Sequence, residues 1–246
     1  MTKIALITGA GTGIGKACAH ELMRGGYHVI FTGRRMDVLQ AAMKEQEGSA
    51  EAISCDVGKA DDVASLFREI EQKHGRLDVL FNNAGIFLAG KLIDELSVEE
   101  WQSAVDVNLT GSFLCARAAF SLMRRQVPMG GRIINNGSIS AYAPRPGSVP
   151  YTVTKHAITG LTKCLALDGR PFDIACSQID IGNAASDLAL PLGEGAKQAN
   201  GEVVPEPLMD LKHVADAVRY MADLPLSANV QFMTIMASKM PYLGRG

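Results

Sequence analysis

The sequence predicts an α/β fold, in which a mainly parallel sheet carries helices on both faces. Three observations lead to this prediction. Short apolar runs alternate with longer segments of helical periodicity along most of the chain. The first apolar run passes through a glycine-rich turn directly into a helix. The spacing between successive runs leaves room for crossover helices, which are right-handed and produce a parallel sheet covered on both sides.

The composition predicts one globular domain over residues 1–246. Hydrophobic residues make up 47% of the chain and charged residues 20%, which is ordinary for a globular protein. A net charge of −2 gives no electrostatic reason to expect nucleic acid or a membrane as a partner. Lys3 and several glycines interrupt the amino-terminal apolar run, so we expect neither a signal peptide nor a membrane span. We therefore expect a cytoplasmic protein.

Cysteine and histidine do not suggest a metal centre. The five cysteines are scattered and form no CxxC pair, so we expect buried, reduced side chains. The five histidines are also dispersed, with no HExxH motif and no other metal-ligand spacing. We therefore expect no metal in the site.

The first strand, turn and helix predict a dinucleotide site. Ile4–Ile7 reads as a buried strand and Lys16–Arg24 as a helix. The turn between them fits T-G-x-x-x-G-x-G, and its backbone N–H groups and the helix dipole favour an anion. Tight strand–helix packing without a ligand is the alternative. The cofactor contacts expected here are Gly9, Thr12, Gly13, Ile14 and Gly15.

The end of the second strand indicates which dinucleotide is bound. Strand Val29–Thr32 leads into Gly33, Arg34 and Arg35, with no acidic residue at its end. An acid at this point bonds the ribose of NAD, whereas arginine suits the 2′-phosphate of NADP. The sequence therefore favours NADP, with NAD possible, and a solvated basic loop is the alternative reading.

Two further strand–helix units follow the same pattern. Helices are predicted over 36–47 and 60–74, and strands over 50–55 and 77–81. Ligands bind at the carboxyl ends of strands in open α/β sheets. We therefore expect cofactor contacts just after these strands, although asparagine is also a common turn residue. The residues concerned are Asp56, Val57, Asn83, Ala84 and Gly85.

A long helix is predicted from Ser97, with Glu100 at the capping-box position, to about Arg125. Asn108 lies inside it although asparagine is a poor helix former, and alone it suggests only an exposed polar position. A strand over 132–136 then leads to Ser138.

Tyr151 and Lys155 are the strongest candidates for catalysis. If 149–167 is helical, they lie at i and i+4 and share one face. A free phenol titrates near pH ~10, and a neighbouring positive charge lowers that value. Ser138 could hydrogen-bond the same substrate oxygen. An ordinary amphipathic helix with no function is the alternative for this pair.

Four motifs, together with Asn108, resemble the short-chain dehydrogenase/reductase family over roughly residues 3–170. The motifs are Thr8–Gly15, Asn82–Gly85, Ser138 and Tyr151–Lys155. The resemblance implies a Rossmann-like, doubly wound sheet of seven strands. It also implies hydride transfer between a nicotinamide cofactor and a small-molecule alcohol or carbonyl, and a homo-oligomer, either a tetramer or a dimer.

The resemblance also assigns roles to individual residues. Tyr151 becomes the general acid/base, and Lys155 lowers its pKa while binding the nicotinamide ribose. Ser138 orients the substrate oxygen, and Asn108 holds a relay water. The expected catalytic set is therefore Asn108, Ser138, Tyr151 and Lys155.

The last third departs from the family pattern. A strand is predicted over 172–179, and Ile181 stands where the family has proline. Cofactor contacts are still expected at Gly182 and Asn183. Residues 183–209, with weak helical signals at 187–190 and 194–200, are expected to form a substrate lid or a disordered excursion. A helix over 211–224, an edge strand over 230–236 and an unassigned tail complete the chain.

Three functions remain open from the sequence. The first is an NADP-dependent oxidoreductase acting on a secondary alcohol or its ketone. The second is a dinucleotide-binding sensor or scaffold without turnover, suggested by the unusual 180–186 segment. The third, epimerisation or dehydration of a nucleotide sugar, ranks lowest because the chain is short for a further substrate domain. Arg145, just after Ser138, is expected to be solvated rather than to pair with a substrate carboxylate.

Overall fold

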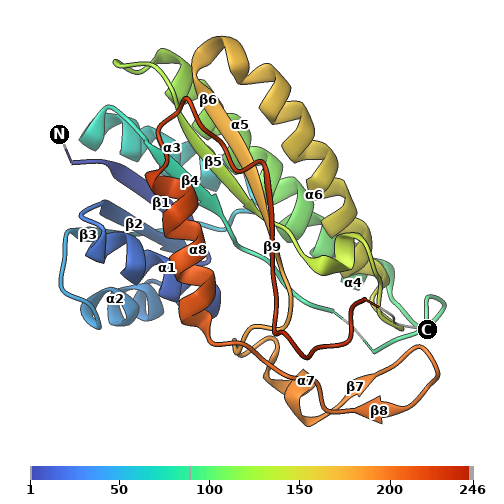
Figure 1. The fold of residues 1–246 in the computed structure, drawn as a ribbon. Helices are drawn as coiled ribbons and strands as arrows, with labels where there is room; N and C mark the ends of the chain where they lie inside the picture. The colour runs from blue at the N-terminus through green and yellow to red at the C-terminus, as the bar shows by residue number, and fades with distance from the viewer. Residues whose placement is uncertain (1, 89, 244–246) are drawn as a thin grey trace.

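The computed structural model describes residues 2–88 and 90–243 (Figure 1). Its centre is a seven-stranded sheet in the order β3-β2-β1-β4-β5-β6-β9, and every pairing in it is parallel. The predicted doubly wound sheet is therefore confirmed. The strands are β1 (Ile4–Thr8), β2 (His28–Gly33), β3 (Ala50–Ser54), β4 (Val79–Asn82), β5 (Gly131–Asn136), β6 (Ile174–Ile181) and β9 (Phe232–Ile235).

Helices cover both faces of the sheet, and the alternation of side chains along the strands explains why. Ala5 and Ile7 of β1 belong to one hydrophobic cluster, whereas Ile4 and Leu6 belong to the cluster on the other face. The first face is covered by α1 (Gly13–Arg24), α2 (Met36–Lys44) and α8 (Leu211–Asp223). The second face is covered by α3 (Ala60–His74), α5 (Ser112–Arg125) and α6 (Val149–Asp168).

The order of the strands determines where a ligand can bind. The chain winds outward from β1 to β3 on one side and from β4 to β9 on the other. The loops that leave β1 and β4 therefore separate and open a crevice at the carboxyl edge of the sheet. None of the described helices combines the length and the apolar character that crossing a bilayer requires.

The long helix predicted from Ser97 to Arg125 is divided into three parts. It begins as α4 (Val98–Ala104), continues as the π-helical segment η1 (Val105–Gly111) and ends as α5. The predicted capping box is present: the Ser97 hydroxyl accepts the Glu100 N–H, and the Glu100 carboxylate accepts the Ser97 N–H. The helix predicted from Ser97 to Arg125 is therefore confirmed, although its backbone widens around Asn108. The exposed position suggested for Asn108 is wrong, because its side chain is buried.

Several element boundaries also differ from the prediction. α2 ends at Lys44, and β9 is shorter than the strand expected over 230–236. β6 begins at Ile174 rather than 172, because the 3-10 turn η3 (Arg170–Phe172) precedes it. The tail, in contrast, packs on the protein as far as residue 242: Met240 is buried, and Tyr242 contacts the core.

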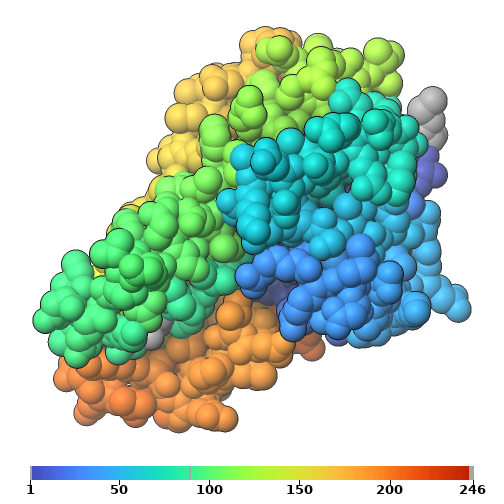
Figure 2. Space-filling view, turned by 180° about the vertical axis from the view of Figure 1, so that it is seen from behind, coloured from blue at the N-terminus to red at the C-terminus, as the bar shows by residue number. Residues whose placement is uncertain are grey.

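The segment 183–209 is ordered by a short helix and a small hairpin. The helix α7 spans Leu190–Glu194, and β7 (Ala196–Lys197) pairs antiparallel with β8 (Val203–Val204). The helical signal at 194–200 was therefore wrong, because residue 195 is a glycine and the hairpin turn contains Gly201 at φ +91°. The segment lies at one end of the molecule, coloured orange, in both views (Figures 1 and 2).

Candidate active site

A cavity of about 350 Å³ opens at the carboxyl edge of the sheet. It brings together residues from the glycine-rich turn, the ends of β2 and β4, α6 and the segment after β6. Asp56 and Asn108 do not line it. The predicted site residues that do are Gly9, Thr12, Gly13, Ile14, Gly15, Arg34, Arg35, Val57, Asn83, Ala84, Gly85, Ser138, Tyr151, Lys155, Gly182 and Asn183.

The glycine-rich turn forms a cradle for an anion. Gly13 begins α1 with φ +51°, a conformation that L side chains rarely adopt. A Cβ on Gly15 would lie 2.1 Å from the Gly9 carbonyl oxygen, so only glycine allows this close packing. Thr12 makes no side-chain cap, and the first turn of α1 carries no acidic residue. The N–H groups at this end of α1 are therefore available to a phosphate.

Two arginines extend the cavity beyond β2. Arg34 and Arg35 follow the strand directly, and both side chains are exposed. Among the described residues no ion pair engages either guanidinium group. Both arginines line the cavity, so an anionic ligand there would meet two positive charges.

Asn83 holds three strands together at the crevice. Its amide nitrogen donates to the Thr8 carbonyl at 2.9 Å, and its amide oxygen accepts from Asn136 Nδ2 at 2.8 Å. These bonds join the ends of β1, β4 and β5. Asp56 instead closes its own turn, because its carboxylate accepts the Gly58 N–H at 3.1 Å.

α6 places Tyr151 and Lys155 against the cavity, as the sequence predicted. The Tyr151 hydroxyl is hydrogen-bonded to Ser138, which precedes the 3-10 turn η2 (Ile139–Ala141). The Lys155 ammonium lies 5.5 Å from the centre of the Tyr151 ring and donates to the Asn136 carbonyl at 2.6 Å. A phenol, a hydroxyl and an ammonium thus meet in one corner of the cavity.

The pKa values of this corner are governed by burial. Burial raises the pKa of Tyr151, and the hydrogen bond from Ser138 and the charge of Arg145 only oppose that effect. The expected lowering of the Tyr151 pKa by Lys155 is therefore not found. Lys155 is itself perturbed: burial lowers its pKa to about 8, although the nearby Asp180 carboxylate favours the charged form.

Asn108 lies behind the cavity in the π-helical segment. Its side-chain oxygen accepts the Ile86 N–H at 2.8 Å, and its side-chain nitrogen donates to the Ile86 carbonyl at 3.0 Å. The same nitrogen lies 3.3 Å from the Thr154 hydroxyl on α6. The buried amide therefore fixes the loop after β4 relative to the helix that carries Tyr151. π-helical turns are frequent at functional sites.

Asp180 is a site residue that the sequence reading missed. One carboxylate oxygen accepts the Ser138 N–H at 3.0 Å and Gln178 Nε2 at 2.7 Å, and the other accepts the Tyr142 hydroxyl at 3.0 Å. Burial raises the pKa of Asp180, although these hydrogen bonds oppose the shift. A carboxylate in a strand whose other residues are all uncharged was the signal that could have identified it.

Arg145 is not a solvated loop residue, and that expectation was wrong. Its guanidinium donates to both carboxylate oxygens of Glu206 at 2.5 Å and to the Asn183 side-chain oxygen at 3.0 Å. The side chains of Arg145 and Glu206 are 11% and 1% exposed. Burial alone would raise the pKa of Glu206, but hydrogen bonds from Arg145, Gln198 and Asn183 lower it to about 2. This pair connects the cavity wall to the segment 183–209.

Comparison with known proteins places the chain in a family. Residues 3–197 match the sequence profile described as "short chain dehydrogenase". A 3beta-hydroxysteroid dehydrogenase of Mediterraneibacter gnavus is 41% identical over 180 residues, which cover 72% of this chain and 64% of that protein. A 3-oxoacyl-[acyl-carrier-protein] reductase of Synechocystis sp. is 32% identical over 241 residues, or 94% of each chain.

A solved structure supports the same assignment. The chain aligns with an actinorhodin polyketide ketoreductase variant, solved with NADPH, at a TM-score of 0.86 and 26% identity. The alignment covers 96% of each chain. On the matched motifs, the shared sheet and these relatives, this chain belongs to the short-chain dehydrogenase family.

Proposed function

We propose that the protein is an NADP-dependent oxidoreductase that transfers a hydride between nicotinamide and a secondary alcohol or its ketone. The observation that carries the proposal is the meeting of the Tyr151 hydroxyl, Ser138 and the Lys155 ammonium in one cavity with the glycine-rich turn. The names of the relatives, dehydrogenases and reductases, support this reaction class.

The residues present fit a dinucleotide cofactor. The pyrophosphate would meet the free N–H groups at the start of α1, beside Gly13 and Gly15. The exposed Arg34 and Arg35 suit a 2′-phosphate, so NADP is preferred and NAD is the alternative. When bound, the nicotinamide supplies the hydride donor or acceptor.

The side chains around Tyr151 perform the proton chemistry. Tyr151 donates a proton to the substrate oxygen during reduction and accepts it during oxidation. Ser138 hydrogen-bonds the same oxygen and stabilises the charge that develops on it. Lys155, with a pKa of about 8 in the structure, places a titratable positive charge next to the tyrosine ring. Its proposed role is to favour the phenolate, in opposition to burial, which holds the pKa of Tyr151 above its usual value.

The walls of the cavity favour a mainly apolar substrate. The Phe87 ring packs edge-on against Tyr151 at 4.9 Å, and Ile86, Leu188 and Leu192 also line the cavity. The names of the relatives contain a hydroxysteroid and a 3-oxoacyl group, each of which places one reacting oxygen on a mainly apolar carbon skeleton. We therefore place the substrate of this chain in that class.

Residues 183–209 are proposed to act as a lid over this substrate. Asn183, Leu188 and Leu192 line the cavity, and Glu206 connects the segment to Arg145. A closed lid excludes water from the reacting atoms.

A homo-oligomer in the cytoplasm is proposed as the working form. Phe113 on α5 and Val153 on α6 are exposed apolar side chains that a second copy could cover. A reducing compartment is supported by the five cysteines, all of which are unpaired.

Tyr151→Phe tests the proposed chemistry. With NADPH and a panel of 3-ketosteroids and 3-oxoacyl thioesters, the variant should lose at least ~100-fold in kcat, because it removes the hydroxyl proton that Tyr151 transfers to the substrate oxygen. NADPH affinity, followed by fluorescence, should change little. Tyr220→Phe, on the exposed face of α8, is the matched control.

Two outcomes of this experiment would contradict the proposal. Retained turnover in Tyr151→Phe would exclude the assigned acid/base. NADPH binding by the unmodified protein, without turnover of any substrate in the panel, would favour the sensor or scaffold instead.

A further inference from the structure

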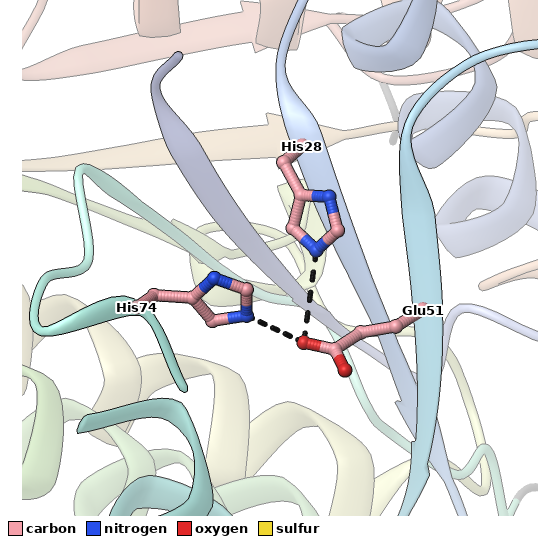
Figure 3. A group of neighbouring side chains, drawn as sticks. All are labelled: His28, Glu51 and His74. Carbon is pink, nitrogen blue, oxygen red and sulfur yellow. Dashed lines mark hydrogen bonds and ion pairs between the residues drawn. The ribbon is translucent and has the colours of Figure 1, made fainter. Parts of the chain in front are cut away.

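Three side chains that are far apart in the sequence meet at the edge of the sheet opposite the cavity (Figure 3). His28 is the first residue of β2, Glu51 lies near the start of β3, and His74 is the last residue of α3. All three therefore lie at the amino edge of the parallel sheet, whereas the cofactor crevice lies at the carboxyl edge. The reaction proposed above has no use for them.

Both imidazoles point at one carboxylate oxygen (Figure 3). His74 Nε2 lies 2.6 Å from Glu51 Oε1, and His28 Nε2 lies 3.6 Å from the same atom. The three potential ligand atoms all lie within 4.8 Å of one another. Tetrahedral zinc, with bonds of about 2.0–2.1 Å to nitrogen and oxygen, holds neighbouring ligand atoms roughly 3.3 Å apart. Small side-chain rotations would bring the three atoms to that spacing.

The environment of the two His28 ring nitrogens favours a cation between His28 and Glu51. His28 Nδ1 lies 2.7 Å from the Ser49 hydroxyl. His28 Nε2 is inaccessible to solvent and has no hydrogen-bond partner among the described residues. When Nδ1 carries the proton and donates to Ser49, the Nε2 lone pair faces a carboxylate, which is unfavourable without a positive charge between them. An outer hydrogen bond of this kind is typical of metal-ligating histidines.

We propose that His28, Glu51 and His74 form a zinc-binding site, with water as the fourth ligand. Two imidazoles and one carboxylate are a donor set that suits zinc. The side chains are 17–21% exposed, so the group lies near the surface, although His28 Nε2 itself is buried. Bound zinc would join β2, β3 and α3, and its role is to stabilise the fold rather than to take part in hydride transfer.

Lys73 is the charge that opposes metal binding. Its ammonium lies 2.8 Å from Glu51 Oε2, the oxygen that faces away from the two histidines, and 2.7 Å from Glu69 Oε1. Lys73 therefore neutralises part of the carboxylate charge that a cation would otherwise meet. Removing the Lys73 charge while keeping its aliphatic stem should therefore tighten zinc binding.

The test uses the full chain without a histidine tag, freed of metal by a chelator. Zinc is titrated during thermal unfolding, and Co²⁺ replaces it for visible spectroscopy. We expect one equivalent to bind, a tetrahedral Co²⁺ spectrum, and a rise in Tm. Zinc at 100 times its Kd should shift the folding equilibrium about 100-fold.

Variants separate this site from adventitious binding. His28→Ala and His74→Ala should each weaken zinc binding by at least ~10-fold and abolish the tetrahedral Co²⁺ spectrum, since each removes one of three ligands. Lys73→Met, at an exposed position, should bind zinc more tightly than the unmodified protein. His213→Ala removes an exposed histidine from α8 and should change nothing.

Several results would overturn the proposal. One is that zinc fails to bind at one equivalent, and another is that the tetrahedral Co²⁺ spectrum survives the loss of both His28 and His74. The third such result is that His213→Ala weakens zinc binding as much as His28→Ala and His74→Ala do. Lys73→Met does not disturb the core, so looser binding by this variant also counts against the site. NADPH-dependent turnover should be the same with and without zinc, because the two sites lie at opposite edges of the sheet. Failure of the oxidoreductase assay would therefore leave the zinc result intact.

Discussion

Glu206→Gln tests whether the buried ion pair with Arg145 holds the segment 183–209 in place. The substitution keeps the size of the side chain and most of its hydrogen-bonding capacity but removes the charge. It leaves the guanidinium of Arg145, which is 11% exposed, without its anionic partner. Breaking a buried pair in this way costs about 3–5 kcal/mol, because a charge remains buried and uncompensated.

The pKa of Glu206 provides a second estimate of the same quantity. The value falls from 4.5 to about 2 in the folded protein, which corresponds to about 3 kcal/mol of stabilisation at neutral pH. Because the folded pKa is depressed, this stabilisation is fully present above pH 4.5 and is lost as the pH falls toward 2. The difference between the unmodified protein and Glu206→Gln should therefore shrink below pH 4.5.

Two assays measure the loss. Urea unfolding at pH 7 gives the free energy of unfolding, and limited proteolysis reports local opening of the segment 183–209. If the segment opens without global unfolding, cleavage should accelerate more than ~100-fold while the global transition moves little. Glu202→Gln, an exposed position on the same segment, is the matched control. If Glu206→Gln and Glu202→Gln behave alike in both assays, the ion pair does not hold the segment.

Two further predictions concern the cofactor and the acid/base pair. Arg34→Ala should weaken NADPH binding about 10- to 100-fold and leave NADH binding unchanged, because a charged hydrogen bond contributes about 1.5–3 kcal/mol. Arg68→Ala, at an exposed position on α3, is the control. An equal loss of affinity for both cofactors in Arg34→Ala would argue against a contact with the 2′-phosphate. Asp180→Asn should move the alkaline limb of the pH–rate profile to lower pH. The Asp180 carboxylate raises the pKa values of both Lys155 and Tyr151, so a limb that stays in place or moves upward would exclude this role.

The parallel sheet and its crossover helices follow from local sequence patterns. Continuous apolar runs such as Ile4–Ile7 fit only strands that are covered on both faces, and the spacing between runs requires crossover helices. Two positions of the first turn require glycine: Gly13 has a positive φ, and Gly15 packs closely against the Gly9 carbonyl. The shared face of Tyr151 and Lys155 follows from a four-residue spacing on a helix. Each of these features depends on neighbours in the chain.

Other features arise only where distant segments meet. Gly195 and Gly201 turn the expected second helix of 183–209 into a hairpin, and Glu206 of that segment meets Arg145 from the loop after Ser138. His28, Glu51 and His74 show no metal-ligand spacing in the sequence, because they converge from two strands and a helix.

The sequence by itself therefore determined the sheet, the glycine-rich turn and the shared face of Tyr151 and Lys155, the pair that we propose for acid/base chemistry. The tertiary structure decided the electrostatics of that pair: burial raises the pKa of Tyr151 and lowers that of Lys155, and the unforeseen Asp180 influences both. The physical reason is that periodicity and turn chemistry act over a few residues, whereas desolvation and charge pairing depend on every segment packed around a group.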